Sequence, residues 1–216
     1  MIKFTPLILL FLMLSCGNKE TILLPKSNVT FIKNIEDHSP IYIFFRVNDK
    51  DTLAEVNKKN EIISTNWILN IDKRLPLRLV IPAVMKLQEK KRSEVAHKNE
   101  LAENYYSYAD SIGKNMAFLP FTKVVYKMEK PFSMDSFLRF KKNGMVQFKE
   151  TNEYDFSKEK LEEFLNNLFI ERECEVVFSF DKSMSYEEYI QDKILIEKLV
   201  IKKKGIWINH YKEFIY

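Results

Sequence analysis

Glycine is scarce in this chain, and its scarcity excludes several architectures. Only four of the 216 residues are glycine. Glycine-rich phosphate-binding loops, β-propellers and flexible linkers need glycine where the backbone turns tightly or approaches a ligand closely. We therefore expect none of these three features. Hydrophobic residues make up 46% of the chain, which is enough for one large domain or two small ones with real cores.

Cysteine and histidine are also rare, which argues against a disulfide framework, a metal centre and thiol catalysis. Cys16 and Cys174 lie in such different contexts that we expect no disulfide, and Cys174 is most simply a small buried residue. His38, His97 and His210 lie at no metal-ligand spacing from one another or from a cysteine. We expect no catalytic, cofactor-binding or metal-binding residues. The alternative is a cryptic enzyme, in which the fold brings Cys174 or His210 to an acid.

The charges are nearly balanced and finely interspersed. Lysine and arginine number 34, against 30 aspartates and glutamates. The two basic triplets, at residues 90–92 and 202–204, each close an apolar helical pattern, where cations suit the negative end of the helix. The alternative is a nucleic-acid patch, but no stripe of aromatic and basic residues accompanies either triplet. We expect no nucleic-acid partner.

The chain lacks an apolar run long enough to cross a bilayer. Its apolar stretch at residues 4–14 follows Lys3 and has the length of a signal-peptide core. The ending "LMLSCG" resembles a bacterial lipobox, in which the cysteine becomes the lipidated first residue. We therefore expect a signal peptide at residues 1–15, lipidation of Cys16, a tether at residues 16–27, and attachment to a membrane of the bacterial cell envelope, on the periplasmic or outer-membrane side. The alternatives are an ordinary cleaved signal with an incidental cysteine, or a buried helix.

Two stretches of the sequence are alike. "WILNIDKRLPLRLVIPAVMKL" and "VVFSFDKSMSYEEYIQDKILI" each place an apolar strand before Asp-Lys and then a helical pattern, with Asp72 and Asp181 lying 109 positions apart. Residues 115–126 also match residues 205–216 at an offset of 90, which assigns 19 additional residues and an extra helix to "SEVAHKNELAENYYSYADSIG". We expect two related units, at residues 28–129 and 130–216. The alternative is that both stretches only share a common strand-to-helix pattern.

The second unit has the clearer pattern. "FLRFKKNGMVQFKE" predicts a hairpin with a two-residue turn at Asn143-Gly144. A helix capped by Ser157 follows, then a strand at residues 174–180 and a helix opened by a capping box between Ser185 and Glu188. "IWI" and "EFIY" supply final strands. The expected order is ββαβαββ.

The first unit is less regular. "VTFI", "IYIFFRV" and "NWILNI" predict strands, and "TLAEVNKKN" predicts a short helix. Pro76 suits a first helical turn, whereas Pro82 must kink or delay the helix around it. With its extra helix, the unit completes an expected α+β fold of two ββαβαββ-like units.

The hairpin, helix, strand ending in Asp181 and following helix resemble the periplasmic domain of the ExbD/TolR family of biopolymer-transport proteins. The resemblance covers residues 133–216 well and residues 28–126 loosely. It implies a domain that pairs with itself and with periplasmic partners or cell-wall material. Family members also carry a membrane-spanning helix with an acidic residue used in proton-driven work. The apolar segment of this chain contains no Asp or Glu, so the resemblance does not extend to energy conversion.

The leading hypothesis is a non-catalytic binding or scaffold module of the cell envelope, with no cofactor. Partners would be the membrane through its lipid anchor and a second copy or an envelope protein. Tyr105, Tyr106, Phe214 and Tyr216 are the candidate interaction surface, and "KEFIY" is a candidate sheet edge for strand addition. Core packing is the alternative for the tyrosines. The alternative function is a small αβ lipoprotein of unrelated function that binds a ligand or envelope partner.

Overall fold

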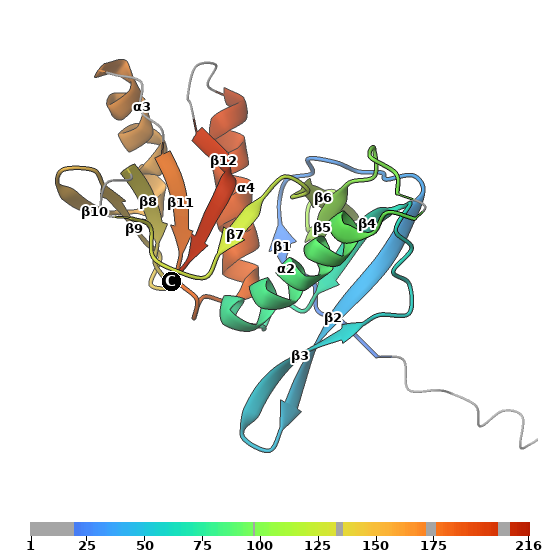
Figure 1. The fold of residues 1–216 in the computed structure, drawn as a ribbon. Coiled ribbons are helices and arrows are strands. Elements are labelled where there is room, and N and C mark those ends of the chain that lie inside the picture. The colour runs from blue at the N-terminus through green and yellow to red at the C-terminus, as the bar shows by residue number, and fades with distance from the viewer. Residues whose placement is uncertain (1–19, 97, 133–135, 172–175, 203–207) are drawn as a thin grey trace, which may run out of the picture.

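The computed structural model shows an α+β protein with two mixed β-sheets side by side (Figure 1). It describes residues 20–96, 98–132, 136–171, 176–202 and 208–216. Within these residues each sheet has six strands. A continuous apolar core runs through both halves of the molecule and includes Trp67, Ile71, Tyr108, Phe140 and Phe180.

The N-terminal half forms the first sheet, in the order β1-β5-β4-β2-β3, with β6 beside β5. Strand β4 runs parallel to both β2 and β5, whereas β3 and β6 pair antiparallel with their neighbours. Helix α2 follows β4 and buries one apolar stripe. The elements are β1 (Lys26–Ser27), β2 (His38–Asn48), β3 (Asp51–Asn57), β4 (Asn66–Ile71), α2 (Leu77–Ser93), β5 (Asn104–Asp110) and β6 (Asn115–Pro120).

The C-terminal half forms the second sheet, in the order β10-β9-β8-β11-β12-β7. Strand β11 lies parallel to β8 and β12, and β12 lies parallel to β7. The elements are β7 (Val125–Lys127), β8 (Ser136–Phe140), β9 (Met145–Lys149), β10 (Glu153–Ser157), the 3₁₀ helix η1 (Lys158–Lys160), α3 (Leu161–Glu171), β11 (Val176–Phe180), α4 (Tyr186–Lys202) and β12 (Ile208–Ile215).

Five strands of each sheet correspond. The order β1-β5-β4-β2-β3 matches β7-β12-β11-β8-β9, and every matched pair of neighbours runs in the same relative direction. In both units the central strand leads into a helix. Asp72 N–H donates to Ile43 O and Asp181 N–H donates to Phe140 O, each at 3.1 Å. The two aspartates therefore occupy equivalent surroundings, as the sequence offset predicts.

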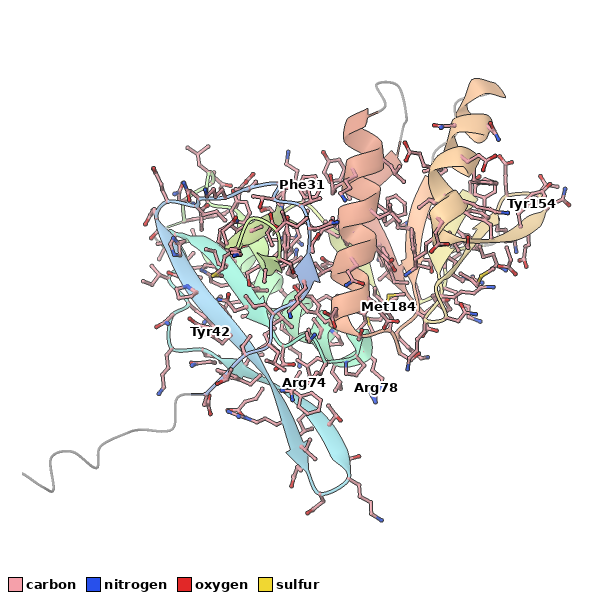
Figure 2. All side chains as sticks on the ribbon, turned by 180° about the vertical axis from the view of Figure 1, so that it is seen from behind. Phe31, Tyr42, Arg74, Arg78, Tyr154 and Met184 are labelled. Carbon is pink, nitrogen blue, oxygen red and sulfur yellow. The ribbon has the colours of Figure 1, made fainter. Side chains whose placement is uncertain are left out.

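The two strand-to-helix junctions pair with each other. Pro76 and Ser185 form an antiparallel bridge at the centre. Four backbone hydrogen bonds flank it: Leu77 N to Met184 O (2.9 Å), Tyr186 N to Leu75 O (2.8 Å), Arg78 N to Lys182 O (2.9 Å) and Glu187 N to Lys73 O (3.1 Å). When each residue is replaced by the one 109 positions away, the bond from Leu77 to Met184 becomes the bond from Tyr186 to Leu75. In the same way, the bond from Arg78 to Lys182 becomes the bond from Glu187 to Lys73. The units are thus related by a local two-fold axis, and Arg74, Arg78 and Met184 gather beside it (Figure 2).

Two predicted helices are strands. Residues 52–57 of "TLAEVNKKN" belong to β3, and β5 replaces the extra helix of the first unit. The spacing of the tyrosines fits the period of a helix and that of a strand. In the structure Tyr106 and Tyr108 point into the core at the two-residue period of a strand, and aromatic side chains favour strands. Strand β5 is therefore the counterpart of β12, and the match of residues 115–126 to 205–216 is wrong. The first unit adds β6 instead of a helix.

Two short strands pair across the predicted unit boundaries. Lys26–Ser27 lie in the predicted tether yet form β1 beside β5. Val125–Lys127 lie in the predicted first unit yet form β7 beside β12. Strands of two or three residues are too short to show an alternation that the sequence alone would reveal.

Several local predictions can be compared with the structure. The Ser185 capping box is confirmed: Glu188 N–H donates to Ser185 Oγ at 3.2 Å, and Ser185 N–H donates to Glu188 Oε2 at 2.9 Å. Helix α2 continues through Pro82. The hairpin at Gly144 has a three-residue loop, because Lys141 N–H bonds to Met145 O, and Gly144 takes the left-handed conformation at φ 78°.

The other local predictions fit less well. Ser157 makes no side-chain cap, and a 3₁₀ turn precedes α3. In "VTFI" the structure shows only an isolated bridge from Ile32 to Phe118. The final strand is a single one, described from Ile208 onward.

Candidate functional site: an open sheet edge beside a groove

The residues considered as alternatives for catalysis or metal binding lie mostly outside the part of the chain that the structure describes. In the part of the chain that the structure describes, no three His, Cys, Asp or Glu side chains gather as metal ligands. His38 is exposed, and its Nδ1 lies 2.8 Å from Ile35 O. Cys16, His97, Cys174 and the side chain of His210 lie outside the described residues. Among the described helices, none combines the length and apolar character needed to span a bilayer.

The residues of the candidate interaction surface divide into two pairs. Tyr106 and Phe214 are fully buried and therefore belong to the core. For Tyr106 this agrees with the alternative interpretation, core packing. Tyr105 and Tyr216 are partly exposed. The expected edge at "KEFIY" is wrong, because β12 lies between β11 and β7.

A buried polar network joins the units. The Tyr126 hydroxyl lies 2.7 Å from that of Tyr106 and 3.4 Å from that of Tyr189. Tyr189 Oη donates to Glu213 Oε2 at 2.7 Å, and Lys193 Nζ donates to Glu213 Oε1 at 2.5 Å. Burial raises the pKa of all three tyrosines well above its usual value. They therefore stay neutral and act as hydrogen-bonding ties between the units.

A shallow groove lies where this network approaches the surface. It has a volume of about 290 Å³ and is lined by both units, including Phe121, Lys123, Lys193 and Tyr211. The Lys123 ammonium lies 6.0 Å from the centre of the Tyr211 ring. This groove is a second, smaller candidate site.

The outer side of β3 is an open sheet edge. Among the described residues β3 pairs only with β2. The carbonyl of Ile43 accepts a bond from Asp72 N–H, so Ile43 points its backbone groups away from β3. Its antiparallel partner Val56 then points its own groups outward, and alternation extends this to Thr52 and Ala54. These three residues present unpaired donors and acceptors to an added strand.

A groove of about 420 Å³ lies between this edge and α2. Its apolar lining comes from both elements: Ala54, Val56, Leu79, Pro82, Ala83 and Leu87. Lys58, Lys86 and Lys90 lie around it, and Lys90 pairs with Glu61. Glu61 Oε1 is buried and has no hydrogen-bond partner within the described residues. The site therefore combines backbone donors and acceptors, an apolar floor and a lysine-rich rim.

The hairpin of β2 and β3 continues beyond the sheet as an arm, residues 44–55 (Figure 1). Strand β2 pairs with β4 only as far as Ile43, and its remaining residues pair with β3 alone. Arg46 lies over the Phe44 ring at 5.0 Å and forms ion pairs with Glu55 and Glu20. Neither the arm nor the open edge is among the features predicted from the sequence. The polar turn "NDKD" between two apolar-containing runs was the available signal.

Comparisons with known protein families, curated proteins and solved structures found no match to this chain.

Proposed function

We propose that this protein is a lipid-anchored, non-catalytic binding or scaffold module of the bacterial cell envelope. In this proposal it resembles the periplasmic domain of ExbD/TolR proteins and holds an extended segment of an envelope partner along β3. The open edge of β3 beside the α2 groove is the observation that carries the proposal. A peptide that adds a strand to a sheet gains affinity from backbone hydrogen bonds and specificity from pockets for alternate side chains.

The composition of the groove defines the segment that would fit. The side chains of Ala54 and Val56 line the groove, so alternate side chains of an added strand would lie over the same apolar floor. Lys58 and Lys86 at the rim favour a nearby acidic residue in the partner. The expected ligand is an extended peptide with alternating apolar residues and at least one carboxylate.

The opposite edge of the molecule is less suited to this role. Strand β10 closes the second sheet, and ion pairs Lys141–Asp155 and Lys149–Glu153 lie along it. Charged side chains on an edge strand hinder the addition of another strand. On β3 the ion-paired Glu55 lies on the face opposite Ala54 and Val56, which line the groove. We therefore place the partner on β3.

Replacing Ala54 by proline tests strand addition directly. Proline at this position removes an outward N–H while leaving the hydrogen bonds between β2 and β3 intact. A photo-crosslinking residue at Lys58 of the full-length protein should capture a partner in membranes, and Ala54→Pro should abolish the adduct. Ala54→Val, which keeps the N–H, is the matched control, and unchanged melting temperatures show that both variants fold. An equally strong adduct with Ala54→Pro would refute binding by strand addition.

The lipid anchor has a separate test. Cys16→Ala should release the protein from the membrane fraction, because the acyl chains are the expected attachment. Unchanged fractionation would contradict the lipoprotein proposal and leave the peptide site standing.

The groove between the units favours ligand binding as a second candidate function. Its lining of Phe121, Lys123 and Tyr211 suits a small molecule that combines an apolar ring with an anionic group. A ligand-dependent rise in melting temperature that Lys123→Ala abolishes, in a protein without a peptide partner, would favour this function.

A further inference from the structure

The first described residues of the chain lie against the body and contact it at several points. Glu20 forms an ion pair with Arg46 on the arm. Leu23 N–H donates to Asp72 Oδ2 at 3.4 Å, and Lys73 N–H donates to Leu23 O at 2.8 Å. Strand β1 then pairs with β5. The segment from Glu20 onward is therefore part of the folded body and adds no length to a tether.

The distance from the expected anchor is correspondingly short, an argument that rests on the proposed lipidation of Cys16. Only three residues separate Cys16 from Glu20. A fully extended chain covers at most ~3.6 Å per residue, so these four steps reach roughly 14 Å. The headgroup layer of one leaflet alone is about 5–8 Å thick. The arm, held to Glu20 through Arg46, cannot stand far from the membrane.

The face of the arm that receives Glu20 has the composition of a membrane interface. Strand alternation and the pairing of Arg46 with Leu53 and of Phe44 with Glu55 place Tyr42, Phe44, Arg46, Leu53 and Glu55 on one face. Phe44 is only 8% exposed, and Glu55 is neutralised by its ion pair with Arg46. The rings of Tyr42 and Phe44 stack at 5.9 Å, with Arg46 over Phe44. Leu53 remains 46% exposed. Aromatic, arginine and leucine side chains together suit the boundary between headgroups and acyl chains.

We infer that this face of the arm lies against the lipid headgroups of the membrane that holds the anchor, with the short tether imposing the contact. The turn carries Asp49 and Asp51 beside Lys50, so the contact does not depend on anionic lipid. The edge of β3 points sideways from this face and remains open to a peptide.

Headgroup quenching in vesicles tests the orientation. Full-length lipidated protein with Cys174→Ser is reconstituted into vesicles of phosphatidylethanolamine and phosphatidylglycerol that contain nitroxide-labelled headgroups. A fluorophore is placed on Leu53→Cys or, as control, on Tyr154→Cys. Tyr154 is similarly exposed, at 51%, and lies on β10 at the opposite end of the molecule from the arm (Figure 2). The label at Leu53→Cys should lose about half of its fluorescence or more, and the control should lose little.

The outcomes separate the two proposals. Failure of the protein to float with vesicles would refute the anchor and this orientation with it. Flotation with equal quenching at both sites would refute the orientation and leave the anchor intact. A flexible Gly-Ser insert of about 12 residues after Lys19 adds roughly 20 Å of average reach. It should restore the fluorescence at Leu53→Cys, and persistent quenching would show that the tether does not impose the contact.

Discussion

The two units share their centre and differ at their rims. Each has the same five-strand order, a central strand ending at an aspartate and a helix packed behind it. The first unit alone has the long arm, the added strand β6 and the open edge at β3. The second alone covers the corresponding edge with β10. The shared elements bury the core, whereas the unshared ones create the exposed edge and groove on which a binding function depends.

The interior shows a second difference at equivalent positions. Tyr106 lies opposite Leu69 of β4, and Glu213 lies opposite Phe178 of β11. Because Leu69 and Phe178 correspond at the offset of 109, Tyr106 and Glu213 are counterparts. On the helices, Tyr189 and Lys193 of α4 correspond to aliphatic residues of α2 at the offset of 109. The buried polar network therefore draws its charges from the second unit alone. Stability should respond unequally to changes in the two units.

Removing the buried carboxylate should have the largest effect. Glu213→Ala leaves Lys193 buried without its ion partner and should lower the free energy of unfolding by about 3–5 kcal/mol. Urea denaturation measures the loss. Glu55→Ala in the exposed Arg46–Glu55 pair is the control and should cost at most ~1 kcal/mol. Similar losses in both variants would show that the buried charge pair contributes no more to stability than an exposed one.

A double replacement sharpens this result. Lys193→Met combined with Glu213→Leu removes both charges and keeps the volume, so most of the stability lost in Glu213→Ala should return. If the double variant is as unstable as the single one, the hydrogen bond from Tyr189 to Glu213 matters more than the charge pair.

Asp192, a buried acid on α4, should have the next largest effect on stability. Its counterpart in the first unit, at the offset of 109, is Ala83. Asp192 is 2% exposed, and its Oδ1 accepts a bond from Lys158 Nζ at 2.6 Å. Burial raises the pKa of Asp192 to about 6, and the nearby Glu188 adds to this while Lys158 opposes it. The folded protein thus binds one proton more than the unfolded chain between about pH 4 and pH 6, and its stability falls as pH rises through that window.

Asp192→Asn removes the proton-binding group and should flatten this part of the pH profile. A shift of about two pKa units corresponds to roughly 3 kcal/mol between about pH 4 and pH 7. Unfolding free energies of the wild type and the variant, measured across that range, give the difference. Asp155→Asn, in the exposed pair with Lys141, is the matched control for replacing a carboxylate by an amide. Parallel profiles for wild type and Asp192→Asn would contradict the assignment.

The sequence revealed the shared parts of the units better than the unshared ones. Asp72 and Asp181 end apolar strands and precede helical patterns, so local sequence alone marks the repeat and its offset. Ser185 and Glu188 likewise form a cap from residues three positions apart. In contrast, β1 and β7 pair through backbone groups over two and three residues. Strands of this length are too short for an alternation of buried and exposed residues to be recognised in the sequence.

The binding edge was missed for a related reason. "DTLAEVN" fits a helix and a strand about equally, and only its pairing with β2 decides between them. The expected edge at the C-terminal strand failed because β7, from a distant segment, occupies that place. Which edge of a sheet stays open depends on long-range pairing, which a local pattern does not contain.

The smallest expected effect concerns the two central residues of the local two-fold axis. Ser185 caps α4 through its reciprocal bonds with Glu188, whereas Pro76 makes no side-chain cap for α2. Ser185→Ala should cost about 1 kcal/mol, the usual value of an N-terminal cap. Pro76→Ala should cost somewhat less, about 0.4–1 kcal/mol, through the greater freedom of the unfolded chain.

Adding Glu188→Ala distinguishes a true capping box from two independent contacts. Each side chain of the box accepts a bond from the backbone N–H of the other, and the Ser185 hydroxyl also donates to the Glu188 carboxylate at 2.7 Å. Removing either partner therefore disturbs the geometry of both, and the double variant should lose less than the sum of the single losses. Thermal unfolding of the two single variants and the double variant gives the coupling. Strict additivity would mean that the two residues act separately and that the two helix starts differ less than their hydrogen bonds indicate.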